Sequence, residues 1–174
     1  VPGQPLWLLG AEIALMGAEA AETLFDIEPR VALLSYSNFG SVKHAHAAKV
    51  AAALEIVQRA RPDLVVDGEM QADTALNAEV AAVFPHSRIK GDANVLVFPD
   101  LQSGNIGYKL LANVSHATTV GPILCGLNKP VNVLNHVASV DEIVRAAAIT
   151  ALQARRGARK TAAARVAPTE WTTR

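Results

Sequence analysis

The stretch Ala93-Asn-Val-Leu-Val-Phe-Pro-Asp-Leu-Gln-Ser-Gly-Asn-Ile-Gly-Tyr-Lys-Leu-Leu-Ala112 decides the fold class. It opens with Val95 to Phe98, a short apolar run rich in β-forming residues that is typical of a strand buried on both faces. Pro99 ends this strand because proline has no amide hydrogen to donate to a neighbouring strand. Polar residues over 100–105 then supply a turn and a helix cap, and the apolar residues that follow recur at helical spacing.

This order of strand, polar turn and helix N-terminus has two interpretations. A helix N-terminus presents unpaired N–H groups and a positive dipole end, which suit a phosphate-bearing ligand. The alternative is an ordinary connection between a strand and a helix, since Gly and Ser are common in such turns.

Composition limits the classes of protein. The chain has 174 residues, of which 51% are hydrophobic, enough for a sizeable core in one domain or two small ones. The formal charge is zero, which argues against a nucleic-acid partner. No apolar run approaches the roughly 20 residues that span a bilayer, so no membrane partner is expected. The single cysteine, Cys125, excludes an internal disulfide framework and favours a reducing, cytoplasmic compartment.

Strands and helices alternate along the chain, which predicts a three-layer α/β fold with a mainly parallel sheet and flanking helices. Strands are expected over 31–34, 64–66, 95–98, 118–124 and 131–134, and helices over 11–26, 42–60, 74–83, from 106 onward, and from 139 to about 153. We expect an extended lead-in over 1–10, one domain over 11–154, and a basic flexible tail over 155–174.

Four polar loops follow predicted strands. They cover residues 35–41, 67–73, 100–105 and 135–139. In open parallel sheets, ligands bind beyond the carboxyl ends of the strands. The loops are therefore expected to gather at one edge of the sheet and to form a shared site.

Other reactive residues give weaker signals. His44 and His46 are two positions apart near a helix start, so they are not expected to share a face, and no metal site is predicted. Asp67, Glu69 and Asp73 form either a metal or acid–base group, or a set in which Asp73 caps a helix and Glu69 is a solvated loop residue. Cys125 follows a predicted buried strand, which favours an inert thiol.

Four segments together carry a resemblance to a known family. They are 30–41, 67–76, 98–109 and 121–131. In order and spacing they resemble the phosphate acetyltransferase/butyryltransferase family, over roughly residues 12–154. The family domain is longer, and the chain resembles its C-terminal half. The resemblance implies an isocitrate-dehydrogenase-like α/β fold with two subdomains, acyl-CoA and phosphate bound in the cleft between them, and dimerisation.

Two kinds of protein carry this domain, and the motifs are divided between them. One is the free-standing phosphotransacetylase, and the other is a bacterial NADP-dependent malic enzyme with a phosphotransacetylase-like extension that senses acetyl-CoA and assembles the enzyme. The segments 37–41 and 68–73 look more like the malic-enzyme version. The segment 105–109 is common to both and leans slightly towards the free-standing enzyme.

Residues 134–144 differ from the family pattern at the places that carry its chemistry. Active transferases usually have Leu-Ser-Arg-Gly-Cys-Ser-x-x-Asp-Ile-Val here, where the resemblance gives the Arg a role in stabilising the transition state and the Asp a role in deprotonating the CoA thiol. This chain has Asn135 for Ser, His136 for Arg and Glu142 for Asp. Histidine is shorter than arginine and mostly neutral at pH 7. Glu142 stands three residues after Ser139, a capping-box spacing that gives it a structural role. We expect transferase activity to be weak or absent.

The resemblance assigns site residues as follows. The catalytic positions are His136, Glu142 and Asn135, and the ligand-binding positions are Ser37, Asn38, Ser41, Lys43, Asn105, Tyr108, Lys109 and Lys129. The expected ligands are acetyl-CoA or a related CoA ester and phosphate, with no metal and no resident cofactor in this segment, and a homodimer or higher oligomer is implied.

Three functions are left open. The first is an acetyl-CoA-responsive regulatory and assembly domain of an NADP-dependent malic enzyme. The second is an active phosphate acetyltransferase, which moves an acetyl group between CoA and phosphate. The third is a structural half-domain used only for assembly.

Overall fold

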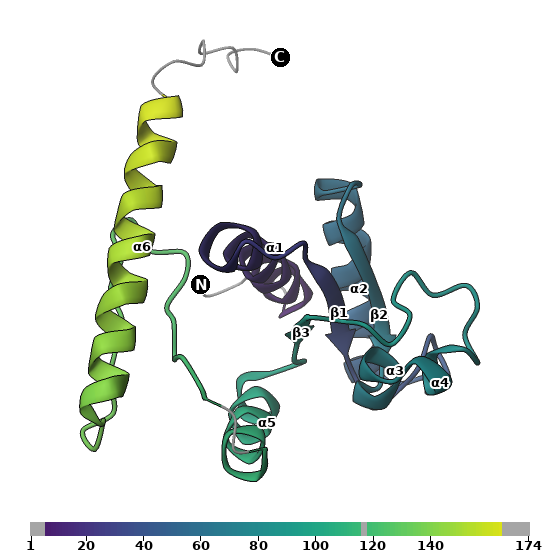
Figure 1. Cartoon of the computed structure of the whole chain (residues 1–174). Coiled ribbons are helices and arrows are strands. Elements are labelled where there is room, and N and C mark those ends of the chain that lie inside the picture. Colours follow the sequence, from purple (N-terminus) through teal and green to yellow (C-terminus); the bar gives the residue numbers. More distant parts are fainter. Residues whose placement is uncertain (1–5, 116–117, 165–174) are drawn as a thin grey trace. The chain divides into compact units, whose positions relative to one another are not determined.

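The computed structural model describes residues 6–115 and 118–164, with side chains described from 8 to 155 outside that gap. The chain divides into two compact units, Val1–Ala117 and Thr118–Arg174, which are treated separately below. Figure 1 labels the helices and strands of both units.

A parallel sheet organises the first unit. Its strands are β1 (Arg30–Leu34), β2 (Val65–Met70) and β3 (Val95–Val97), in the spatial order β2-β1-β3. Both pairings of the central strand β1 are parallel. Four of the five β1 residues are buried, as expected of a strand covered on both faces.

Two helices cover one face of this sheet. These are α1 (Leu6–Phe25) and α2 (Ala45–Ala60), which pack against each other and against the strands. The core on this face joins alanines of α1 to aliphatic residues of the sheet and of α2. Its buried members are Ala11, Ala14, Ala18, Val31, Leu33, Val50, Ala53, Val57, Leu64, Val66 and Val97.

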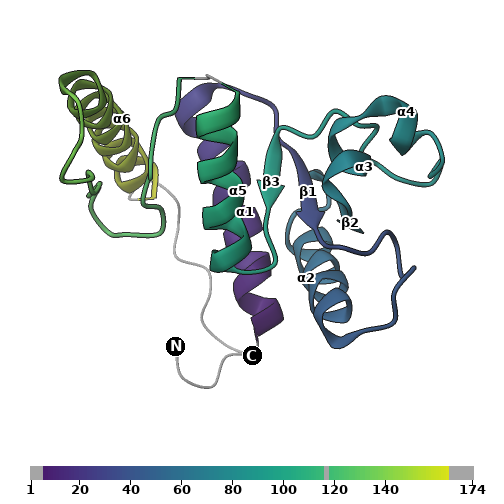
Figure 2. The same ribbon diagram turned by 90° about the horizontal axis from the view of Figure 1, so that it is seen from below.

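The opposite face is covered by shorter elements. The helices α3 (Ala72–Leu76) and α4 (Ala78–Ala81) are followed by an irregular segment up to β3. A second core cluster forms on this face from Ala32, Leu34, Met70, Ala75 and Ile89. Figure 2 shows α2 and α3 on opposite sides of β1 and β2. The predicted three-layer α/β architecture is confirmed.

The helix α5 (Leu101–Val114) begins directly after β3 and earlier than the predicted residue 106. Asp100 is its N-cap, and the carboxylate accepts a hydrogen bond from the amide of Ser103 at 2.8 Å. Gly107 lies against the ring of Phe98, and a Cβ built there would stand 2.9 Å from that ring. No residue of α5 is buried.

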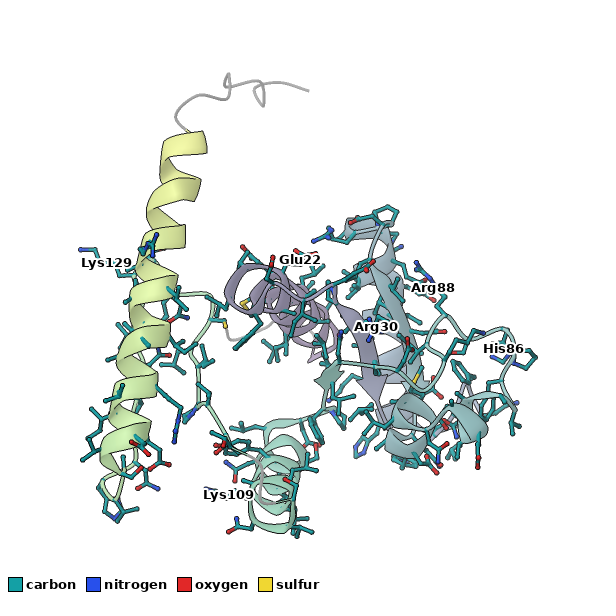
Figure 3. The ribbon with its side chains drawn as sticks, in the orientation of Figure 1. Glu22, Arg30, His86, Arg88, Lys109 and Lys129 are labelled. Carbon is teal, nitrogen blue, oxygen red and sulfur yellow. The ribbon has the colours of Figure 1, made fainter. Side chains whose placement is uncertain are left out.

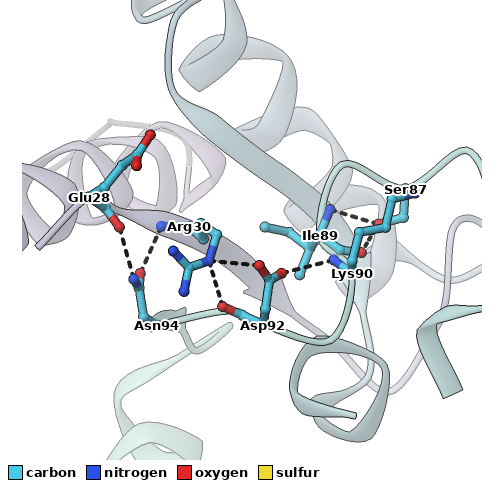
Figure 4. A network of polar contacts seen from close by, with 7 residues as sticks. All are labelled: Glu28, Arg30, Ser87, Ile89, Lys90, Asp92 and Asn94. Carbon is cyan, nitrogen blue, oxygen red and sulfur yellow. Dashed lines mark hydrogen bonds and ion pairs between the residues drawn. The ribbon is translucent and has the colours of Figure 1, made fainter. Parts of the chain in front are cut away.

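The amino edge of the sheet is held by a polar network (Figure 4). Asn94 accepts a bond from the amide of Arg30 at 2.7 Å and donates one to the carbonyl of Glu28 at 2.9 Å. The guanidinium of Arg30 pairs with Asp92 at 2.9 Å. These contacts hold the beginnings of β1 and β3 together, at the edge of the sheet away from the carboxyl ends of the strands.

Several predicted boundaries in this unit are wrong. Helix α1 begins at Leu6, so the described part of the predicted lead-in is helical. The predicted helix 74–83 is interrupted at Asn77, whose side chain caps α4 through the amide of Glu79. Strand β2 continues to Met70, because residues 67–69 are buried between layers instead of turning in solvent.

The buried face of α1 is lined by small residues and not by its larger apolar ones. Helical spacing alone would also allow a buried face with Ile13, Met16, Ala20 and Leu24. Ile13 is 44% exposed, whereas Ala11, Ala14 and Ala18 are fully buried. Small side chains let neighbouring elements approach closely, and here they belong to the core that α1 shares with α2 and the sheet.

The described part of the second unit, residues 118–164, contains one helix, α6 (Val140–Ala164). The predicted strands 118–124 and 131–134 are wrong, since the described part of 118–139 contains no strand. Instead, the Asn132 side chain accepts from the amide of Leu124 at 2.9 Å and donates to Thr150 and Gln153 of α6, both at 2.8 Å. The segment is therefore tied to the helix by side chains.

Helix α6 passes the predicted end near 153, and the last ten residues of the predicted tail, 165–174, lie outside the described residues.

The predicted capping box at the start of α6 is confirmed. The Glu142 carboxylate accepts bonds from the amide of Ser139 at 2.7 Å and from its hydroxyl at 2.8 Å. The Glu142 amide donates to the Ser139 hydroxyl at 3.3 Å. The two residues thus satisfy each other's free groups at the helix start.

Candidate functional site

A cavity of about 560 Å³ lies at the carboxyl edge of the sheet in the first unit. Its apolar wall comes from the end of β1, from the turn after β3 and from the start of α3, at Leu34, Phe98, Pro99 and Ala72. Its polar wall comes from the loop after β1, from α2 and from the start of α5, at Ser35, Tyr36, His46, Lys49, Asp100 and Ser103. Three of the four polar loops predicted to share a site thus contribute to one cavity.

The loop after β1 is built around a buried carboxylate. Glu69 is only 3% exposed, and its Oε1 accepts a hydrogen bond from the Ser37 hydroxyl at 2.8 Å and one from the Gly40 amide at 2.7 Å. The expectation that Glu69 is a solvated loop residue is wrong, because the residue belongs to β2 and faces the loop from within the fold. No motif in the sequence signalled this role, since Gly68 before it looks like a turn residue.

Three predicted ligand-binding residues take part in holding this loop. Ser37 is fully buried, and its hydroxyl lies 3.2 Å from that of Ser41. The Asn38 side chain accepts from the amide of Gln71 at 2.7 Å, and the Asn38 amide donates to Ser41. The polar groups of these residues therefore bond to one another within the loop and to Gln71, which directly follows β2.

Lys43 lines a different hollow. This hollow measures about 450 Å³ and lies beside the N-terminus of α2, where Gly40, His44, Glu69 and several alanines also border it. Lys43 itself is exposed. It is therefore near the loop but does not line the larger cavity.

The two histidines near the start of α2 are in contact, contrary to the expectation that they do not share a face. Their rings lie 4.8 Å apart, edge to face. His44 is the N-cap with an extended backbone, so helical spacing does not apply to it, and its ring nitrogen accepts from the amide of His46. Tyr36 adds a third ring 6.4 Å from His44. In the described parts of the chain, no group of three His, Cys, Asp or Glu side chains can hold a metal ion.

Charge in the cavity comes from Lys49 and Asp100. The Lys49 ammonium donates to the carbonyl of Pro99 at 2.5 Å and so connects α2 to the turn before α5. The amide of Ser103 holds the pKa of Asp100 below its usual range, with a smaller contribution from the positive charge of Lys49.

The predicted site residues on α5 lie outside the cavity lining. Asn105, Tyr108 and Lys109 are exposed on this helix, and Figure 3 shows Lys109 projecting from it. The helix contributes Ser103 to the cavity instead, one turn closer to its start.

The predicted catalytic residues belong to the second unit. Asn135 and His136 are exposed in the turn before α6, and Glu142 is exposed in its first turn. The amide of Ser139 holds the pKa of Glu142 below its usual value of 4.5. Lys129 is also exposed, in the segment before this turn (Figure 3).

Cys125 is exposed, and partial desolvation raises the pKa of its thiol. A raised pKa lowers the fraction of reactive thiolate at neutral pH. The thiol is therefore disfavoured as a nucleophile, although it is not buried behind a strand as expected.

No helix in the described residues is long and apolar enough to cross a membrane.

The chain matches the family model described as phosphate acetyl/butaryl transferase over residues 5–151. It is 51% identical over 148 residues to a phosphate acetyltransferase of Clostridium acetobutylicum, covering 84% of this chain and 44% of that protein. It is 49% identical over 145 residues to an NADP-dependent malic enzyme of Haemophilus influenzae, covering 83% of this chain and 19% of that protein.

The same relationship holds for solved structures. A phosphotransacetylase from Streptococcus pyogenes superposes with a TM-score of 0.83 at 48% sequence identity, covering 88% of this chain and 46% of that one. The chain therefore belongs to the phosphate acetyl/butaryl transferase family. It spans about half the length of the phosphate acetyltransferases that it matches.

Proposed function

We propose that this chain is the substrate-binding half of a phosphate acetyltransferase domain, and that the completed domain transfers an acetyl group between CoA and phosphate. The observation that carries the proposal is the cavity at the carboxyl edge of the sheet, in a chain about half identical to phosphate acetyltransferases. Its apolar wall suits the acyl and thioester part of a substrate, and its Lys49 and His46 side suits an anion.

The proposed transfer is a substitution at the acetyl carbonyl carbon. The CoA sulfur attacks this carbon in acetyl phosphate, a C–S bond forms, the C–O bond to phosphate breaks, and inorganic phosphate leaves with the electron pair. The thiol proton passes to a base. From the family pattern we propose Glu142 as this base and His136 as the residue that stabilises the transition state, with Asn135 next to it in the sequence.

The chemistry of these three residues is weaker than that of the family pattern. The lowered pKa of Glu142 makes its carboxylate a poorer proton acceptor. The histidine at position 136 lacks the permanent charge and the planar fork of donors with which an arginine holds phosphate oxygens. We therefore propose slower transfer than in relatives that have arginine and aspartate at these positions.

The second candidate function is the one expected from the sequence, an acetyl-CoA-responsive regulatory and assembly domain of a malic enzyme with weak or no transferase activity. Two observations favour it: the 49% identity to the Haemophilus influenzae enzyme and the substitutions at Asn135 and His136. In this case the same cavity holds a CoA ester, and occupancy changes activity elsewhere by roughly 1–3 kcal/mol of coupling. A cytoplasmic location and a homodimer or higher oligomer are part of both proposals.

The two functions are separated by assays on the native polypeptide that carries this sequence. Thioester formation from acetyl phosphate and CoA is measured beside malate-dependent reduction of NADP. Thioester turnover that falls strongly in His136→Ala supports the transferase. Malate oxidation that responds to acetyl-CoA, with no thioester turnover, supports the regulatory domain. If neither activity nor binding of acetyl-CoA is found, both proposals fail.

A further inference from the structure

Lys49 differs from the other lysines whose side chains the structure describes. It is the only one of them that is not exposed, and it stands on α2 at the wall of the cavity. Its ammonium reaches the turn that joins β3 to α5, where it donates to the carbonyl of Pro99. An ammonium in such a position has lost part of its hydration and needs partners in exchange.

The protein supplies only part of what this ammonium needs. The carbonyl of Pro99 accepts one of its three N–H donors at 2.5 Å. Within the described residues, no carboxylate forms an ion pair with Lys49 inside 4.0 Å. Asp100 also lines the cavity, but its carboxylate is engaged by the amide of Ser103 as the cap of α5. The charge of Lys49 therefore acts on Asp100 only at longer range, and two of its three N–H donors have no hydrogen-bond partner among the described residues. These donors suit an anion supplied by a ligand.

Two further side chains stand beside Lys49 on the same cavity. His46 is three positions earlier on α2, so it lies on the same face of the helix one turn away. Tyr36 is 50% exposed and contributes a phenol from the loop after β1. Leu34 and Phe98 are apolar residues of the same lining. The cavity thus offers an ammonium, an imidazole and a phenol together with apolar side chains.

We propose that Lys49 binds the phosphoryl group of the substrate in this cavity, with His46 as a second donor. The ligand class is inorganic phosphate or an acyl phosphate whose short acyl chain lies against the apolar wall. This inference rests on the proposed function, because it takes phosphate as a substrate. It assigns the anion to a lysine of the first unit, in addition to the positions that the family pattern marks before α6.

The test is a phosphate and acetyl phosphate titration of the 174-residue chain, followed by NMR or calorimetry. Lys49→Met keeps the aliphatic stem and removes the charge, and Lys49→Gln keeps a donor for Pro99 without the charge. Both are expected to bind phosphate at least about tenfold more weakly, and Lys49→Arg within about threefold of the wild type. The matched control is Lys90→Met, because Lys90 also donates to a proline carbonyl, that of Pro85 at 3.0 Å, but does not line the cavity.

Three results overturn the inference. The first is wild-type phosphate affinity in both Lys49→Met and Lys49→Gln when circular dichroism shows that they are folded. The second is a wild-type chain that shows no saturable phosphate binding. The third is a loss of CoA binding in these variants with phosphate binding unchanged, which would assign Lys49 to the phosphates of CoA. The proposed function is tested separately by thioester formation in the native polypeptide, so it can fail while Lys49-dependent phosphate binding stands.

Discussion

Replacing Ser37 by alanine tests whether the loop after β1 is held by Glu69 or used to contact a ligand. The Ser37 side chain is fully buried. Its hydroxyl donates to Glu69 at 2.8 Å and accepts from the amide of Val42 at 3.0 Å. Alanine fits the space of serine closely, so the change removes these bonds with little loss of packing.

The magnitude follows from the two bonds. A hydrogen bond to a charged group contributes about 1.5–3 kcal/mol, and an ordinary one such as that from the Val42 amide about 0.5–1.5 kcal/mol. We therefore expect Ser37→Ala to lower the free energy of unfolding by about 2–4 kcal/mol, a large part of the roughly 5–15 kcal/mol that stabilises a domain. Ser41 is exposed and bonds at the edge of the same loop, so Ser41→Ala should cost no more than about 1 kcal/mol.

The assay is urea unfolding of wild type, Ser37→Ala and Ser41→Ala, followed by circular dichroism at constant temperature. Titration of the folded proteins with acetyl-CoA gives the second readout. If Ser37→Ala changes stability by less than about 0.5 kcal/mol and yet abolishes ligand binding, Ser37 contacts the ligand and the structural reasoning is refuted. A loss of stability with ligand affinity retained at low temperature supports it.

Three further predictions concern the rest of the chain. Gly91→Ala should lower stability by at least about 2 kcal/mol in urea unfolding, because Gly91 has φ +81° and a Cβ there would lie 2.3 Å from the backbone nitrogen of Ala78. The hydrogen bond from the Ser139 amide lowers the pKa of Glu142 below its usual 4.5, so the capping contribution of Glu142 is present above that pH and lost on further acidification. The helicity of α6 should therefore fall in acid, and the Glu142→Gln variant should show a smaller dependence, since glutamine also completes a capping box. Asn132→Ala should raise hydrogen exchange at the amide of Leu124, which bonds to that side chain; unchanged exchange would contradict this contact.

The sheet of the first unit was predictable because the residue pattern of its strands is itself typical of buried strands. Val31 to Leu34 and Val95 to Phe98 are apolar runs bounded by polar or proline residues, and such runs are buried wherever the chain forms a parallel sheet. The three-layer class and the shared edge of the loops follow from this alternation. Helix ends were predicted less well, because they depend on caps such as Asp100 and Asn77 that resemble ordinary turn residues.

The role of Glu69 was not predictable from sequence pattern. A carboxylate after glycine is usually exposed, and only the folded loop shows that two donors face it from Ser37 and Gly40. The strands expected over 118–124 and 131–134 failed for the opposite reason. Their composition favours β-structure, but a strand needs a neighbour to pair with, and in the second unit Asn132 bonds the segment to α6 instead.

On these assignments, binding and chemistry depend on different units of the chain. The cavity with Lys49 is built entirely by the first unit, and the exposed residues at positions 135, 136 and 142 belong to the second. A substitution such as histidine for arginine at position 136 can then weaken the transfer step without removing the fixed cation or the apolar wall that hold a substrate. Proteins that differ in transfer chemistry can therefore share the binding residues. This is one physical reason why a phosphate acetyltransferase and a malic enzyme can each be about half identical to this chain. The separation predicts that His136→Arg raises thioester turnover in the native polypeptide and leaves phosphate affinity of the 174-residue chain within about twofold; parallel changes in both quantities would show that position 136 belongs to the phosphate site itself.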